Sequence, residues 1–177
     1  MSNRSIILVG YMCVGKTTIG KALAQAMGRT FYDLDWYIEE RFRCKIPQLF
    51  AERGEAGFRD IERRMLHEVA EFEHIVLSCG GGTPCFFDNM DYMNRCGKTV
   101  YMKATPEVIY QHLLCSKGER PLLKGKSDEE LRAFITAQLA ERAPFYEKAT
   151  YVQPIQPLDD LDKITQIVEQ LRELLHT

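Results

Sequence analysis

The feature of this 177-residue sequence that most constrains its fold is the stretch from Gly10 to Thr17. It reads Gly-Tyr-Met-Cys-Val-Gly-Lys-Thr and matches the phosphate-binding pattern G-x-x-x-x-G-K-[ST] at every fixed position. The apolar run at residues 5–9 predicts a buried strand before it, and residues 18–27 have the apolar periodicity of a helix after it. An ordinary strand–turn–helix is the alternative, but it does not account for the motif lying where a phosphate-binding loop belongs.

Each part of this loop has an expected role. The glycines allow backbone conformations that a side chain would block, so that loop amides and a helix N-terminus can surround phosphate oxygens. Lys16 should reach the β- and γ-phosphates, and the Thr17 hydroxyl should hold Mg²⁺. We therefore expect ATP to be bound by Gly10, Met12, Cys13, Val14, Gly15, Lys16, Thr17 and Thr18.

Length and composition exclude several classes of protein. The chain is long enough for one α/β domain with a sizeable core. A formal net charge of −2 does not predict a nucleic acid or an anionic membrane as partner. No apolar stretch approaches the length of a membrane span, and the N-terminus leaves no room for a signal peptide. The six cysteines form no C-x-x-C pair, which favours a reduced, cytoplasmic setting.

Two carboxylates follow the strand predicted at residues 30–32, in the sequence Asp33-Leu34-Asp35. On extended chain they should point to the same side, beside the phosphate-binding loop. The alternative is that one of them only caps a helix that starts near Trp36. The later apolar strand at residues 74–78 ends in no acid, so Asp33 is the candidate for the metal site and Asp35 is free for a substrate.

Arg59 and Glu62 lie three residues apart in a helix predicted over residues 55–72, which follows two short predicted helices at 36–42 and 46–52. A solvated salt bridge is the usual fate of such a pair, and it stays open as the alternative.

The strand at residues 74–78 is followed directly by Cys79 and three consecutive glycines, Gly80 to Gly82. Such a run lets backbone amides approach a ligand closely, although a plain flexible turn is the alternative. Thr83 as N-cap and Pro84 after it are predicted to begin the next helix.

The polar, basic segment at residues 116–126 is bracketed by glycines and has the composition of a lid. Ser127 to Glu130 form a capping box that begins the helix after it. Further strands are predicted at residues 98–102 and 149–152. Because strands alternate with helices, the sheet should be parallel with helices on both faces. No guanine-reading N-K-x-D element is found, whereas a lid suits a small-molecule kinase, which must keep water from the phosphate.

Together these pieces resemble the shikimate kinase family, of the nucleoside-monophosphate-kinase-like group, over essentially the whole chain. The resemblance implies a three-layer P-loop fold with a five-stranded parallel sheet flanked by helices and a mobile lid. It implies one kinase domain over residues 1–177, with a substrate-binding region at 33–72 and the lid at 115–127. The residues that carry it are the phosphate-binding loop, Asp33-Leu34-Asp35, Phe58-Arg59-x-x-Glu62, Gly80-Gly81-Gly82, Arg120-Pro121-Leu122-Leu123 and Arg142-x-x-x-Tyr146.

The resemblance also implies a reaction, in which a monomer converts ATP and shikimate into ADP and shikimate 3-phosphate on the way to aromatic amino acids. Asp33 and Thr17 would serve Mg²⁺, and Asp35 would bind substrate hydroxyls and assist deprotonation of the attacking one. Arg59, oriented by Glu62, and Arg142 would hold the carboxylate, and the triple-glycine loop would close on the ring. Arg120 would act on ATP and on the transferring phosphoryl group, which makes the implied catalytic set Lys16, Asp35 and Arg120.

The sequence departs from the family pattern at two places. Leu34 stands where the family often has a small hydroxyl residue. Residues 110–114 stand where many members carry an arginine that stacks on adenine, and His112 is the candidate to stack instead. Two other functions remain open: a kinase for another small hydroxy acid such as gluconate, and a non-catalytic nucleotide-binding module. The intact motif residues argue against the module.

Overall fold

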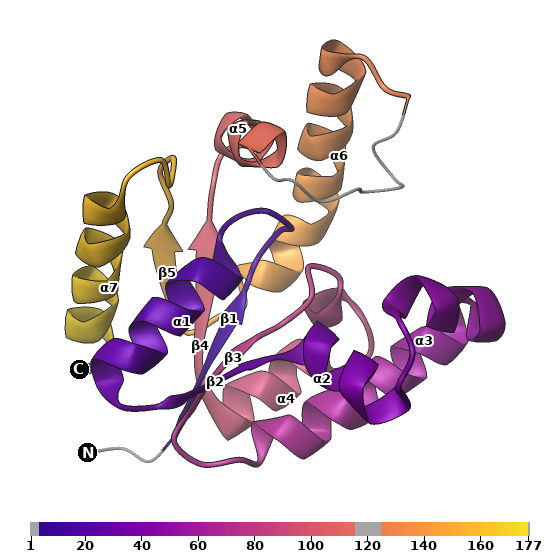
Figure 1. Ribbon diagram of the computed structural model, residues 1–177, viewed down its shortest axis with the longest axis horizontal. Helices are drawn as coiled ribbons and strands as arrows, with labels where there is room; N and C mark the ends of the chain where they lie inside the picture. The colour runs from indigo at the N-terminus through magenta and orange to yellow at the C-terminus, as the bar shows by residue number, and fades with distance from the viewer. Residues whose placement is uncertain (1–3, 116–124, 177) are drawn as a thin grey trace.

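The computed structural model of the chain describes residues 4–115 and 125–176 (Figure 1). Arg120 and most of the predicted lid lie outside these residues. The described residues form a parallel sheet of five strands in the order β2-β3-β1-β4-β5, which confirms the predicted sheet. Its strands are β1 (Ser5–Val9), β2 (Thr30–Asp33), β3 (Ile75–Ser78), β4 (Gly97–Lys103) and β5 (Tyr151–Pro154).

Helices cover both faces of the sheet, as predicted. Helices α1 and α7 lie side by side on one face, and α4 with the C-terminal half of α3 lies on the other (Figure 1). Helices α5 and α6 rise beyond the carboxyl ends of the strands (Figure 1). No helix within the described ranges is long and apolar enough to cross a bilayer. The helices are α1 (Lys16–Met27), α2 (Leu34–Phe42), α3 (Ile46–Ala70), α4 (Asn89–Cys96), α5 (Pro106–Cys115), α6 (Asp128–Tyr146) and α7 (Leu161–His176), with a short 3₁₀ turn, η1 (Thr83–Cys85).

The central strand β1 sets the position of the site. Every residue of β1 and of its neighbour β3 is buried, as expected for parallel strands covered on both faces. Ile7 of β1 pairs with Leu77 of β3 on one side and with Thr99 of β4 on the other. Because all strands run the same way, the loops that follow β1, β2 and β3 meet at one edge of the sheet.

Local signals account for several helix ends. Gly28 adopts a left-handed conformation with φ 63° and donates its amide hydrogen to carbonyls of the last turn of α1, which makes it a C-cap. The capping box of Ser127 and Glu130 is present at the start of α6. Pro144 does not end α6, which continues to Tyr146.

Three predictions of local structure were wrong. Helix α1 begins at Lys16 rather than at residue 18, and α2 begins at Leu34 rather than at Trp36. The two helices predicted at 46–52 and 55–72 are confirmed as two segments of α3, separated where Gly54 takes a non-helical φ of 66° and ψ of 177°. Thr83 does not cap a helix: it lies inside η1, because its hydroxyl bonds to a carboxylate from α3 instead of to backbone.

Candidate functional site

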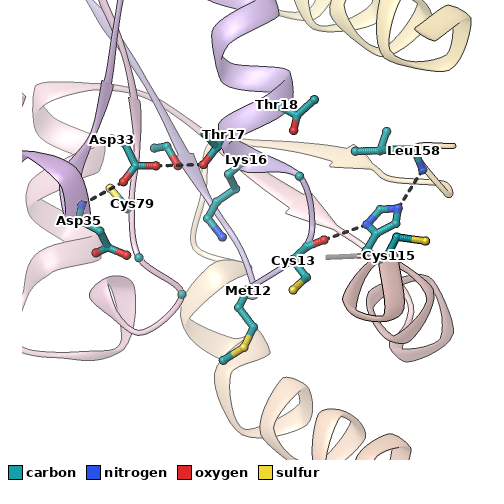
Figure 2. A pocket seen from close by; sticks show the side chains of 15 residues that line it. Met12, Cys13, Lys16, Thr17, Thr18, Asp33, Asp35, Cys79, Cys115 and Leu158 are labelled. Carbon is teal, nitrogen blue, oxygen red and sulfur yellow. Dashed lines mark hydrogen bonds between the residues drawn. The ribbon is translucent and has the colours of Figure 1, made fainter. Parts of the chain in front are cut away.

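A cavity of about 430 Å³ opens at the carboxyl ends of the strands (Figure 2). The phosphate-binding loop forms one wall, the end of β2 and the start of α2 form a second, and the loop after β3 forms a third. Within the predicted nucleotide set, Gly10 and Val14 do not line the cavity, while Thr18 does.

Lys16 points into this cavity (Figure 2). Its Nζ donates hydrogen bonds of 2.7 Å to the carbonyl oxygens of Gly10 and Tyr11, so the lysine is held against its own loop. Burial lowers the pKa of the Lys16 ammonium group to about 8, against the attraction of Asp35. A phosphate group in the cavity would restore the charge that burial disfavours.

The loop around Lys16 has the backbone geometry of an anion-binding concavity. Gly10 and Gly15 have φ values of 144° and 98°, and Cys13, although not a glycine, has φ 61°. A Cβ atom at Gly10 would lie 2.8 Å from the carbonyl oxygen of Met102 in β4, so the loop has no room for a side chain there. Successive amides turned by such left-handed residues can point at one phosphate.

Thr17 and Asp33 bring two oxygen atoms together at the cavity wall (Figure 2). The Thr17 hydroxyl donates to Oδ2 of Asp33 over 3.0 Å. The other carboxylate oxygen, Oδ1, accepts from the backbone amides of Asp35 and Trp36 and so caps α2. The capping alternative is therefore correct for Asp33, yet its second oxygen remains directed at Thr17. Two hard oxygen donors of this kind suit Mg²⁺.

The sequence predicted that Asp35 lies on extended chain, but the structure places it in the first turn of α2. It still faces the cavity, because the helix starts immediately after Asp33 (Figure 2). Burial raises the pKa of the Asp35 carboxyl to about 6, and repulsion from Asp33 and Glu62 adds to the effect while Lys16 opposes it. A carboxylate with a pKa near neutrality is suited to accept a proton from a hydroxyl group.

Arg59 and Glu62 form a buried pair, so the alternative of a solvated salt bridge is wrong. Nη1 of Arg59 donates to Oε2 of Glu62 over 2.8 Å, and the Glu62 residue is 1% exposed. The Thr83 hydroxyl donates to the other carboxylate oxygen over 2.6 Å. The ring of Phe86 lies 4.0 Å from the guanidinium carbon of Arg59. These contacts hold the guanidinium group in one orientation.

The three glycines after β3 separate the other site residues by little more than their own backbone. A Cβ atom at Gly80 would lie 3.1 Å from Oδ1 of Asp35, and one at Gly82 would lie 2.7 Å from Nη2 of Arg59. At Gly81 it would lie 3.5 Å from Nη1 of Arg142. The loop therefore brings together residues from α2, α3 and α6, and it needs glycine for space.

His112 bridges two segments at the far end of the cavity. Its Nδ1 is 2.8 Å from the carbonyl oxygen of Cys13, and its Nε2 accepts a hydrogen bond of 2.8 Å from the amide of Leu158. Figure 2 shows both bonds as dashed lines. Nδ1 must carry the hydrogen, because the amide leaves Nε2 only the role of acceptor. The predicted stacking of His112 on adenine remains a prediction.

Sequence reasoning missed several residues of this region. Leu158 lines the cavity and packs so close that a Cβ atom at Gly15 would lie 2.3 Å from its Cδ1 atom. Cys115 and Ser78 also line it, and Thr83 supports the buried pair. Leu158 carried no signal, because an apolar residue in a loop has no periodicity to indicate a role. Arg120 lies outside the described residues.

Comparisons with known proteins agree on one family. The model of the family described as shikimate kinase matches residues 12–175. A shikimate kinase of Bacteroides thetaiotaomicron is 55% identical over 170 residues, which cover 96% of this chain and 97% of that protein. The crystal structure of a Bacteroides thetaiotaomicron shikimate kinase, 53% identical, superposes with a TM-score of 0.95 and covers 98% of this chain and 99% of its own. A shikimate kinase of Acinetobacter baumannii, solved in complex with shikimate, is 32% identical with a TM-score of 0.82, covering 98% and 93%. The chain therefore belongs to the shikimate kinase family.

Proposed function

We propose that this protein transfers the γ-phosphoryl group of ATP to a hydroxyl group of shikimate, giving ADP and shikimate 3-phosphate. The observation that carries the proposal is the triple-glycine loop, which lies against Asp35, Arg59 and Arg142 at the edge of the cavity that holds Lys16. The subsite for phosphate, at Lys16, and the subsite for the substrate carboxylate, at Arg59 and Arg142, thus meet at Asp35, which is the candidate base. The family match and the relative solved with shikimate favour shikimate over gluconate as the acceptor.

The acid substrate would be held by its carboxylate group. Arg59 offers a guanidinium that Glu62 fixes from one side and Phe86 covers from the other. Among the described residues, its buried Nε has no hydrogen-bond partner. A planar guanidinium fixed in this way suits the two-pronged recognition of a carboxylate. Arg142 would be the second arginine of this subsite.

Asp35 would accept hydrogen bonds from the substrate hydroxyls and take the proton of the attacking one. Its pKa of about 6 keeps it mostly ionised at pH 7 while making it a better base than an ordinary aspartate. Lys16 would leave the loop carbonyls that it now contacts and bind the β- and γ-phosphates. There its positive charge would offset the negative charge of the phosphoryl group during transfer.

Thr17 and Asp33 fit the requirement for Mg²⁺, since each presents an oxygen toward the other at the entrance to the phosphate loop. When bound, the ion would neutralise charge on the β- and γ-phosphates. We assign Thr17 as a direct ligand and Asp33 as a holder that acts through a metal-bound water.

Several further assignments belong to the same proposal. Residues 33–72 would form the acid-binding region of a single kinase domain. The predicted lid at 115–127 lies mostly outside the described residues, as does Arg120, and the role of both remains a prediction from the sequence. The enzyme acts as a monomer in the cytoplasm. Size-exclusion chromatography with light scattering would test the monomer, and a dimer mass would refute it.

The decisive experiment is an ADP-release assay with equal concentrations of shikimate, quinate and gluconate, each with and without Mg²⁺. We expect saturable ADP release with shikimate that requires Mg²⁺. Saturable release with gluconate but not with shikimate would show a kinase of another hydroxy acid. ATP binding without release for any acid would show a non-catalytic module.

A further inference from the structure

Tyr11, the second residue of the phosphate-binding loop, contacts both subsites of the proposed reaction. Its backbone carbonyl oxygen accepts the 2.7 Å hydrogen bond from Nζ of Lys16. Its ring lies under the guanidinium group of Arg142 on α6, 5.5 Å from the guanidinium carbon to the ring centroid. Its hydroxyl donates a 2.6 Å hydrogen bond to Oε1 of Gln138, one turn earlier on the same helix.

Within the described residues, Arg142 also has a side-chain hydrogen bond with Tyr146 of the same helix. Tyr146, one turn beyond it, is fully buried and donates its hydroxyl hydrogen to the carbonyl oxygen of Gly81. Tyr11 and Tyr146 therefore connect α6 to two different loops of the site, with Arg142 between them along the helix. Tyr11 is 2% exposed, so its ring is shielded from water. A contact between a cation and an aromatic face is stronger when it is desolvated in this way.

We propose that Tyr11 is a positioning residue for the acid substrate: it holds Arg142 at the carboxylate subsite from within the nucleotide-binding loop. The inference rests on the proposed function. A phosphate-binding loop needs no side chain at this variable position of its motif, so the aromatic ring serves the neighbouring subsite. The shared residue thus joins the two substrate sites, with its backbone carbonyl at Lys16 and its ring at Arg142.

A simpler account is that Tyr11 is only a core residue whose hydroxyl happens to be satisfied by Gln138. That account predicts that removal of the ring disturbs the loop, and with it nucleotide binding, at least as much as acid binding. The proposal predicts instead that removal of the ring weakens binding of the acid and leaves binding of the nucleotide unchanged. It also predicts that loss of the Tyr11 ring lowers the affinity for shikimate more than loss of the Tyr11 hydroxyl does.

The test compares Tyr11→Leu, Tyr11→Phe, Arg142→Ala and the double variant Tyr11→Leu/Arg142→Ala. Isothermal titration calorimetry gives the Kd of shikimate and of ADP for each protein, and steady-state kinetics gives KM and kcat. Wild-type protein is measured first. Failure of wild type to bind and phosphorylate shikimate would overturn the proposed function itself, and not merely the role of Tyr11.

We expect Tyr11→Leu to raise the Kd of shikimate by roughly 2- to 30-fold, with the Kd of ADP unchanged within twofold. Tyr11→Phe keeps the ring and should retain most of the affinity. In the Arg142→Ala background, Tyr11→Leu should add little, because two residues that act through one contact are not additive. Equal losses for shikimate and ADP, additive losses in the double variant, or wild-type shikimate affinity in Tyr11→Leu would each overturn the inference.

Discussion

The hydroxyl of Thr83 donates a 2.6 Å hydrogen bond to Oε1 of Glu62, while Oε2 of the same carboxylate accepts from Arg59. Thr83 is fully buried in η1, and Glu62 belongs to α3, 21 residues earlier. A buried carboxylate with both oxygens engaged cannot rotate away from its arginine. The orientation of the carboxylate-binding guanidinium therefore depends on the loop that follows β3.

Replacing Thr83 by Val should loosen this arrangement without changing the shape of the side chain. One buried oxygen of Glu62 loses its donor, which costs about 1–3 kcal/mol in the free energy of unfolding. We also expect roughly a tenfold fall in kcat/KM for shikimate, since misplacement of a binding group is costly. Chemical denaturation and kinetics measure both. Thr83→Ser keeps the hydroxyl and is the control; equal damage in both variants would mean that the methyl group, not the hydrogen bond, is what matters.

Replacing Arg59 should affect the acid and not the nucleotide. Arg59→Ala should weaken shikimate binding by about 2–5 kcal/mol, because the buried carboxylate of the substrate loses its guanidinium partner. Arg59→Lys should recover only part of this, since an ammonium group lacks the two-pronged geometry. Titration calorimetry with shikimate and with ADP separates the two effects.

Arg63 provides the matched control for Arg59. It lies on the same helix but pairs with Asp88 at the surface, where its side chain is 39% exposed. Arg63→Ala should leave both affinities within twofold of wild type, as surface pairs contribute little. Full shikimate turnover by Arg59→Ala would refute the assignment of the carboxylate subsite.

Asp35→Asn should abolish most turnover and yet stabilise the protein near neutral pH. The folded-state pKa of about 6 exceeds the ordinary value of 3.8, so the folded state holds its proton more tightly. Wild-type stability is therefore lost as pH rises from 4 to 6, and the full cost is present above this window. The free energy of unfolding of the variant should exceed that of wild type by about 1–3 kcal/mol at pH 7. At pH 4 the two proteins should differ little.

Urea denaturation of the nucleotide-free protein at the two pH values checks the Asp35→Asn prediction. Glu40→Gln makes the same change of charge on the exposed side of α2 and should give a small effect at both. A stabilisation of Asp35→Asn that is equal at pH 4 and pH 7 would contradict the raised pKa.

Cysteine labelling should report on the nucleotide cavity. Cys13 lines it, so bound ATP should slow its alkylation. Cys79 is 2% exposed and burial raises the pKa of its thiol well above the ordinary range, so it should stay unlabelled in brief reactions. Cys44, between α2 and α3, is the control whose labelling ATP should not change. Mass spectrometry after a short pulse of iodoacetamide measures each site, and equal labelling of Cys13 with and without ATP would go against its place at the phosphates.

Signals that act over a few residues were readable from the sequence. The phosphate-binding motif predicted the turn between β1 and α1, Gly28 predicted the end of α1, and Ser127 with Glu130 predicted the start of α6. Alternation of apolar strands with helices predicted the parallel sheet. These features depend on backbone conformation, local hydrogen bonds and periodicity, all of which the sequence carries directly.

Tertiary structure decided which side chains become buried partners. Arg59 and Glu62 have the spacing of a surface salt bridge, and only the packing of the loop after β3 against α3 buries them and supplies Thr83. The same holds for Tyr11 beneath Arg142 and for the link from His112 to Leu158, pairs that lie 131 and 46 residues apart in the sequence. Burial and partner choice depend on chain segments that meet only in the folded sheet, so residue spacing alone could not indicate them.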